Sequence, residues 1–251
     1  VRNVGSSGWL IAVWVITGIM TLIAAISYGE LSGMFPKAGG QYVYLKEAYN
    51  PLMGFLYGWS FFAVIQTATI AAVGVAFSKF LAYLVPELGN TYLLFDLGFM
   101  KIYSGQLVAI FIIILLTFIN SKGVKEGKII QEIFTSAKLI ALFGLIAFGF
   151  FLVKESFWSQ NMATGFNAMK DSGVAGTTGE LQATGWQAIS GNVLMGSIAA
   201  AMVGSIFSSD AWNNVTFIAG EIKNPKRNIG LSLFLGTLIV TLIYVATNLM
   251  Y

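Results

Sequence analysis

Long apolar runs without charged residues alternate with short polar segments along the whole chain. Five stretches lack Asp, Glu, Lys and Arg entirely, and they cover residues 3–29, 48–78, 102–121, 181–209 and 228–251. A sixth stretch, 133–153, contains a single charge, Lys138. A helix that crosses a bilayer needs about 20 mostly apolar residues, so each stretch is long enough to span a membrane.

These runs predict helices, because backbone groups in lipid must bond within their own segment and the runs lack the alternating pattern of barrel strands. The fold class is therefore an all-α polytopic membrane protein. We expect a single transmembrane domain over residues 1–251, with helices at about 9–29, 51–84, 106–119, 133–153, 191–219 and 231–250. The one long connection, 154–190, is rich in Gly, Ser and Thr, and we expect an external loop there with little regular structure.

Basic residues in the connections predict the orientation of the helices. Loops 30–50, 120–132 and 220–230 share one side and carry eight Lys and Arg residues, whereas the opposite side carries four. The excess of positive charge places these three loops in the cytoplasm, and the protein in a plasma or inner membrane as a multi-pass protein. The net charge of +3 is then a topology signal, and we expect no nucleic-acid partner.

The composition excludes several kinds of chemistry. The chain contains no His and no Cys, and only 10% of its residues are charged. A Ser-His-Asp triad, a cysteine nucleophile, a His/Cys zinc site and a disulfide are therefore impossible within it. We expect no enzyme activity, no bound metal and no cofactor.

A polar cluster interrupts the fifth apolar run, in the order Phe207-Ser208-Ser209-Asp210-Ala211-Trp212-Asn213-Asn214. An unbroken lipid-facing helix has no use for such residues, whereas a helix that breaks there exposes backbone groups to a ligand. Free N–H groups after the break suit a carboxylate, and free carbonyls before it suit an ammonium. The structural alternative makes Asp210 the N-cap of a helix from Ala211 to Glu221. Because ionisable residues inside membranes usually serve function, we favour a functional break.

Lys138 is the second ionisable residue deep in a predicted span. Its ammonium could snorkel to the lipid headgroups, or it could be a fixed cation inside the helix bundle, bonded to carbonyls of a broken helix. The sequence leaves both interpretations open.

Two further patterns have a structural interpretation. In the fifth span, small residues recur every fourth position at Gly196, Ala200, Gly204 and Ser208. We expect this helix face to pack closely against another helix. The connection 36–44 contains a proline and the pair Gly39-Gly40, which stop a helix and allow a sharp turn. From its residues alone, it is a tight cytoplasmic connector without evident chemistry.

Three segments resemble the amino acid permeases of the amino acid–polyamine–organocation (APC) superfamily. The first cytoplasmic loop of that family is similar to Glu30-Leu31-x-x-x-x-Pro36-x-Ala38-Gly39-Gly40-x-Tyr42-x-Tyr44. The family's sixth helix and following loop resemble 207–213 together with Glu221, Asn224-Pro225 and Asn228-Ile229. Thr135-Ser136-Ala137-Lys138-Leu139 is similar to the fifth helix of the L-type exchangers and their bacterial relatives. The resemblance covers nearly the whole chain and corresponds to family helices two to seven, so the chain is expected to be a fragment.

The resemblance implies part of a five-plus-five inverted-repeat (LeuT-like) fold with a discontinuous helix at 207–211. It implies a secondary active amino acid transporter, working by uptake or exchange through alternating access. The substrate-binding residues would be Phe207, Ser208, Ser209, Asp210, Ala211 and Trp212. Phe207 would also match the family's aromatic gate. Ser209 and Ala211 stand where the family often has Tyr and Gly, which changes the pocket volume and the backbone freedom.

The resemblance also bears on coupling and partners. Lys138 would lie where sodium-coupled relatives hold a sodium ion, which implies sodium independence and leaves protons as a candidate co-substrate. Animal members are disulfide-linked to a glycoprotein subunit, and a chain without Cys cannot form that link. The expected partners are thus an amino acid substrate and the lipid bilayer.

Other functions remain open from the sequence. One is a permease for polyamines or other organocations of the same superfamily. Another is a channel, which would need rings of like charge or filter repeats, and the sequence contains neither. A third is a non-transporting membrane subunit, which would not need the polar break.

Overall fold

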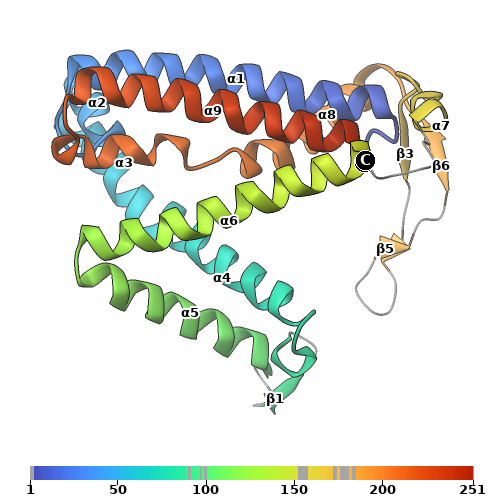
Figure 1. Cartoon of the computed structure of the whole chain (residues 1–251), viewed down its shortest axis with the longest axis horizontal. Helices are drawn as coiled ribbons and strands as arrows, with labels where there is room; N and C mark the ends of the chain where they lie inside the picture. Colours follow the sequence, from blue (N-terminus) through green and yellow to red (C-terminus); the bar gives the residue numbers. More distant parts are fainter. Residues whose placement is uncertain are drawn as a thin grey trace. The chain divides into compact units, whose positions relative to one another are not determined.

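The computed structural model describes residues 3–89, 92–96, 98, 101–151, 158–171, 174–175, 181–182 and 185–250 (Figure 1). The α-helices are α1 (Ser7–Met34), α2 (Gln41–Ala48), α3 (Pro51–Ser60), α4 (Thr67–Leu81), α5 (Ser104–Ser121), α6 (Val124–Phe151), α7 (Trp158–Met162), α8 (Gly191–Ser208) and α9 (Pro225–Met250). Helical segments of other pitch are η1 (Phe61–Gln66, a π-helix), η2 (Pro86–Leu88, 3₁₀) and η3 (Trp212–Glu221, 3₁₀). The strands are β1 (Leu93–Asp96), β2 (Lys101–Tyr103), β3 (Met169–Asp171), β4 (Val174–Ala175), β5 (Leu181–Gln182) and β6 (Trp186–Ala188).

Six helical stretches of the described residues are long and apolar enough to cross a membrane. They are Ser7–Met34, Pro51–Leu81, Ser104–Ser121, Gly127–Phe151, Gly191–Glu221 and Pro225–Met250. The predicted fold class, an all-α polytopic membrane protein, is confirmed. The chain divides into two compact units, one formed by Val1–Tyr44 with Leu139–Tyr251 and the other by Leu45–Lys138.

In the first unit, α1 packs along α9 (Figure 1). Glycines permit this close approach: a Cβ on Gly18 would overlap the Thr241 side chain, and Gly29 lies against the backbone of Gly230. The centre of the packing is a cluster of four buried side chains from α1, η3 and α9. They are Ala25, Ala219, Ile229 and Leu233.

The long connection 154–190 contains more regular structure than expected. Its residues 154–157, 172–173, 176–180 and 183–184 lie outside the described residues. Strand β3 pairs antiparallel with β6, and β4 with β5. The Gly8 amide donates to the Gly165 carbonyl at 2.9 Å, and the Trp9 indole donates to the Phe166 carbonyl at 2.9 Å. These bonds fasten the connection to the start of α1.

In the second unit, α4 packs against α5 where Gly74 approaches Ile113 and the Ala109 carbonyl. The Asn50 side chain caps α3 by accepting from the Met53 amide at 3.0 Å. This unit also contains the short hairpin β1–β2.

Candidate functional site

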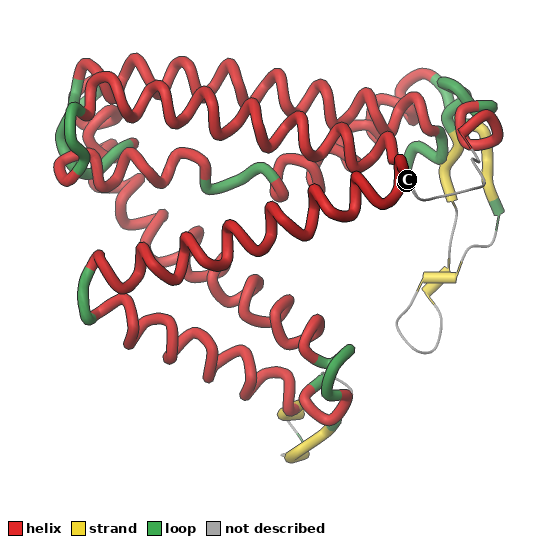
Figure 2. Tube along the Cα trace, viewed as in Figure 1, coloured by secondary structure: helices red, strands yellow, loops and turns green. Residues whose placement is uncertain are grey.

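The candidate site is the break between α8 and η3, which Figure 2 shows as a loop segment between two helical stretches. α8 ends at Ser208, and η3 begins at Trp212. Between them, Ala211 adopts the left-handed conformation, with φ 66° and ψ 2°. That conformation costs a residue with a Cβ roughly 1–2 kcal/mol, so the surrounding structure must stabilise it. The helix predicted to be discontinuous at 207–211 is therefore interrupted.

Several backbone groups in the break have no hydrogen-bond partner among the described residues. On the α8 side, the last bond of the turn runs from the Asp210 amide to the Phe207 carbonyl at 3.2 Å. On the η3 side, the first runs from the Asn214 amide to the Ala211 carbonyl at 3.1 Å. Among the described residues, no hydrogen bond of good geometry involves the intervening amides, which belong to Ala211, Trp212 and Asn213. The Ser209 and Asp210 carbonyls likewise accept none within the described part of the chain.

This arrangement offers both signs of partial charge within a few residues. Unpaired amides at the start of a helical segment attract anions, and unpaired carbonyls before a break attract cations. A zwitterion with a carboxylate and an ammonium on one carbon is complementary to both groups. In a membrane, such backbone is tolerated only where it is buried in protein or lines a water-filled cavity.

The Asp210 side chain does not cap the helical segment that follows the break, which was the alternative interpretation. The N-cap residue of η3 is Ala211, and no side chain caps this segment. The Asp210 side chain is exposed and, among the described residues, makes no hydrogen bond or ion pair. The Ser208 hydroxyl donates back to the Gly204 carbonyl at 2.8 Å. The N-cap interpretation is therefore wrong, because the backbone turns one residue later than a cap at Asp210 requires.

Two helices hold the α8 side of the break. The hydroxyls of Thr17 in α1 and Ser205 in α8 share a hydrogen bond of 2.7 Å, and both residues are buried. The Tyr244 hydroxyl of α9 donates to the Ser208 carbonyl at 3.0 Å. The phenol ring of Tyr244 packs against Trp14 of α1, with the ring centroids 4.9 Å apart.

The connection 36–44 holds the η3 side. The Gly39 amide donates to the Phe217 carbonyl at 3.1 Å. Gly40 has φ +48°, and a Cβ there would collide with the Thr216 hydroxyl. Thr216 is fully buried, and Ala38 approaches Gly220. The segment expected to be a simple connector therefore docks on η3, and the paired glycines allow two backbones to meet.

Aromatic rings of α1 and α2 extend this contact surface to the start of η3, next to the break. The Tyr28 ring lies edge-to-face with Trp212 at 5.2 Å and with Tyr44 at 6.0 Å. The Gln41 amide donates to the Tyr28 hydroxyl. Tyr44 is 6% exposed, and its hydroxyl has no hydrogen-bond partner among the described residues. Burial raises the pKa of Tyr44, because the phenolate is costly to desolvate.

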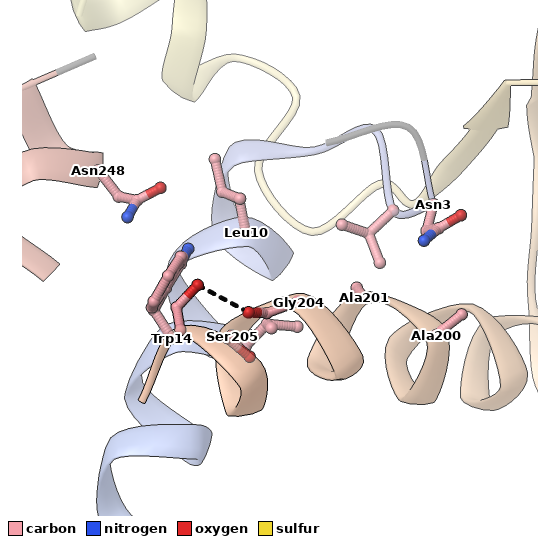
Figure 3. A pocket seen from close by; sticks show the side chains of 11 residues that line it. Asn3, Leu10, Trp14, Ala200, Ala201, Gly204, Ser205 and Asn248 are labelled. Carbon is pink, nitrogen blue, oxygen red and sulfur yellow. Dashed lines mark hydrogen bonds between the residues drawn. The ribbon is translucent and has the colours of Figure 1, made fainter. Parts of the chain in front are cut away.

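A cavity of about 440 Å³ adjoins the α8 side of the break (Figure 3). Its lining comes from the N-terminal segment, α1, α8 and α9, and contains no charged side chain. The lining residues are Asn3, Val4, Leu10, Val13, Trp14, Ala200, Ala201, Gly204, Ser205, Ser208 and Asn248. Three members of the predicted small-residue face, Ala200, Gly204 and Ser208, thus line a cavity. A Cβ on Gly196 or Gly204 would meet no atom of the described structure within 4 Å, so this face has no helix packed against it.

The predicted site residues fall into two groups. Phe207 to Trp212 are consecutive at the break, where Phe207 is 57% exposed and Trp212 is half-buried. Lys138 lies in α6, is exposed, and belongs to the other compact unit. Its ammonium makes no ion pair with a described residue. Among the described residues, no three His, Cys, Asp or Glu side chains gather where they could hold a metal ion.

Sequence analysis missed Tyr244, Tyr28 and the docking role of Gly40. Tyr244 lies in an otherwise ordinary apolar run, and its contact with Ser208 spans 36 residues of sequence. Only the paired glycines offered a signal, since two adjacent glycines often mark a close approach of backbones.

The chain is similar in sequence to amino acid permeases and amino acid transporters. The family model described as amino acid permease matches residues 1–251. The b(0,+)-type amino acid transporter 1 of Oryctolagus cuniculus is 26% identical over 257 residues, covering 99% of this chain and 45% of the relative. The large neutral amino acids transporter small subunit 2 of Mus musculus is 29% identical over 252 residues, covering 100% and 42%. The Asc-type amino acid transporter 1 of Mus musculus is 28% identical over 247 residues, covering 98% and 41%. The chain spans less than half the length of these curated relatives.

Proposed function

This chain belongs to the amino acid permease family, and from this premise we propose that the whole protein is a secondary amino acid transporter. It would work by uptake or exchange through alternating access. One observation carries the proposal: the interrupted helix between α8 and η3, where amides and carbonyls without a partner in the described part of the chain lie side by side. The printed names of the relatives, all amino acid transporters, support the same class of substrate.

The substrate backbone binds at 207–211 and the start of η3. Its carboxylate accepts from the amides of Ala211, Trp212 and Asn213, and its ammonium donates to the carbonyls of Ser209 and Asp210. The Asp210 carboxylate adds a negative charge that favours the ammonium further. Phe207 closes over the substrate as an aromatic gate, and Ser208 and Trp212 complete the binding set.

The cavity beside the break supports an uncharged substrate side chain. Its walls carry only apolar groups, hydroxyls, amides and an indole. A charged side chain placed there would lose hydration without a partner of opposite charge. The name of one relative, a transporter of large neutral amino acids, agrees with this choice.

The orientation and coupling belong to the same proposal. Loops 30–50, 120–132 and 220–230 face the cytoplasm, in a plasma or inner membrane. Lys138 is a fixed cation that replaces a coupling metal ion, so transport is independent of sodium. The alternative is snorkelling of its ammonium to the headgroups, and Lys138→Ala separates the two. That variant should insert normally and cycle slowly, whereas normal transport would favour snorkelling.

Counterflow in proteoliposomes tests the proposal with the full-length protein. Vesicles are preloaded with one unlabelled compound at a time from a panel of neutral, cationic and acidic amino acids and polyamines. Labelled amino acid should accumulate with the neutral preloads. Accumulation driven only by polyamines would move the assignment to an organocation permease, and no accumulation with any preload would contradict exchange.

A further inference from the structure

The carbonyl at the end of α8 has a partner from another helix. Carbonyls in the last turn of a helix lack an intrahelical donor. The Ser208 carbonyl is one of these carbonyls. The Tyr244 hydroxyl of α9 donates to it at 3.0 Å. By contrast, the next two carbonyls, of Ser209 and Asp210, accept no hydrogen bond from the described residues. Three consecutive acceptors at the break therefore differ in their availability to a ligand.

Packing holds the Tyr244 hydroxyl in place. Its ring lies against Trp14 at a centroid distance of 4.9 Å and an interplanar angle of 53°. Trp14 belongs to α1, which packs along α9 (Figure 1) and is joined to α8 by the buried Thr17–Ser205 hydrogen bond. Trp14 lines the cavity beside the break (Figure 3). Ser208 lines the same cavity. The donor and acceptor are thus held by the same group of three helices.

We propose that Tyr244 is a positioning residue of the substrate site. Its hydroxyl takes one of the two lone-pair positions of the Ser208 oxygen, and its ring stands beside that oxygen. The substrate ammonium is thereby directed to the Ser209 and Asp210 carbonyls and away from the end of α8. This inference rests on the proposed function, because it requires an amino acid at the break.

The test is Tyr244→Phe in the full-length protein, reconstituted in proteoliposomes. The substitution removes the hydroxyl and keeps the ring against Trp14. The apparent KM for a transported neutral amino acid should rise about fivefold, because the freed Ser208 carbonyl draws the ammonium out of position and weakens about one of its hydrogen bonds to the Ser209 and Asp210 carbonyls. The maximal rate per inserted molecule should stay within about twofold of the wild type, because the hydroxyl positions the ammonium and takes no part in the conformational cycle.

A second probe separates positioning from general damage. The N-methyl derivative of the same amino acid has one N–H donor fewer on its ammonium. Two N–H donors remain for the two carbonyls, so wild type should discriminate against it through the added methyl group, for which an ammonium held in a fixed position leaves little room. In Tyr244→Phe, the ratio of KM for the N-methyl derivative to KM for the parent should fall about threefold. A purely structural role would lower the rate and leave this ratio unchanged.

Tyr83→Phe is the matched control, because Tyr83 is 85% exposed just after α4. It should equal the wild type in KM and in the N-methyl ratio. If Tyr244→Phe also equals the wild type, or loses only rate, the positioning role is overturned while the transport function stands. If the wild type itself moves no amino acid, the proposed function fails first, and the positioning role fails with it.

Discussion

The two sides of the helix break are held in different ways. On the α8 side, two hydrogen bonds hold the helix end. Thr17 bonds Ser205, and Tyr244 bonds the Ser208 carbonyl. Nearby side chains such as Val203 (68%) and Phe207 (57%) are exposed in this chain. On the η3 side, Thr216 and Ala219 are fully buried, and the segment docks on the connection 36–44.

This difference predicts that the η3 side contributes mainly to stability and the α8 side mainly to ligand binding. Buried surface packed against a neighbouring backbone resists movement, because any shift opens a void or makes a clash. Isolated hydrogen bonds between helices contribute only about 0.6 to 1.7 kcal/mol each. Substitutions on the η3 side should therefore lower the amount of folded protein, whereas substitutions on the α8 side should alter transport more than stability.

The largest effect is expected at Gly40. Gly40→Ala places a Cβ into the Thr216 hydroxyl on a residue with φ +48°. The strained backbone and the overlap together should lower the free energy of unfolding by about 2–5 kcal/mol. Gly98→Ala is the matched control, because Gly98 also has positive φ (+77°) but no atom of the described residues lies within 4 Å of its Cβ position. Thermal unfolding in detergent compares the two variants. Equal losses of stability would mean that the connection 36–44 does not pack tightly on η3.

Next is the exposed aromatic residue beside the break. Phe207→Ala should weaken apparent affinity for substrate about tenfold, the effect of losing one aromatic contact, and should leave thermal stability nearly unchanged. Phe111→Ala removes a ring of similar exposure, 64%, from α5 and should leave affinity unaltered. Binding or uptake measurements on the full-length protein decide this. An unaltered affinity for Phe207→Ala would remove Phe207 from the gate.

A smaller effect is expected from the buried hydroxyl pair on the α8 side. A double-mutant cycle of Thr17→Val and Ser205→Ala should give a coupling energy of about 0.6–1.7 kcal/mol. The measurement is unfolding in detergent of both single variants and the double variant. Additive losses would show that the 2.7 Å contact contributes nothing beyond packing.

The smallest effect is expected at Tyr44 on the η3 side. Its buried hydroxyl has no partner among the described residues, so Tyr44→Phe should be neutral or stabilising by up to about 1 kcal/mol near pH 7. The raised pKa of Tyr44 favours the protonated form in the folded state. This contribution is complete below the unfolded pKa, near 10, and disappears as the pH rises above it. The stability of the wild type should therefore fall relative to Tyr44→Phe only above about pH 10, and parallel pH curves would contradict the burial.

Much of the site could be predicted because the signals were local. Six apolar runs indicated six spans, and a polar cluster in one of them indicated an interruption. The position of the left-handed residue could not be predicted, because Ala has no special preference for that conformation, and the alternative interpretation, an N-cap at Asp210, lay one residue early. The surface that faces the small residues could not be predicted, because recurring small residues permit a close approach without showing what lies against them.

The sequence by itself determined which segments are membrane helices and where one of them breaks. The reason is that backbone hydrogen bonding in lipid is satisfied within a segment, so its requirements are readable from consecutive residues. The tertiary structure alone decided which groups at the break are paired. Tyr244, Thr17 and Gly40 act on atoms far away in sequence, 188 residues away for Thr17 and Ser205. Such contacts depend on how α1, α8, η3 and α9 pack together, and no periodicity within one helix specifies that packing.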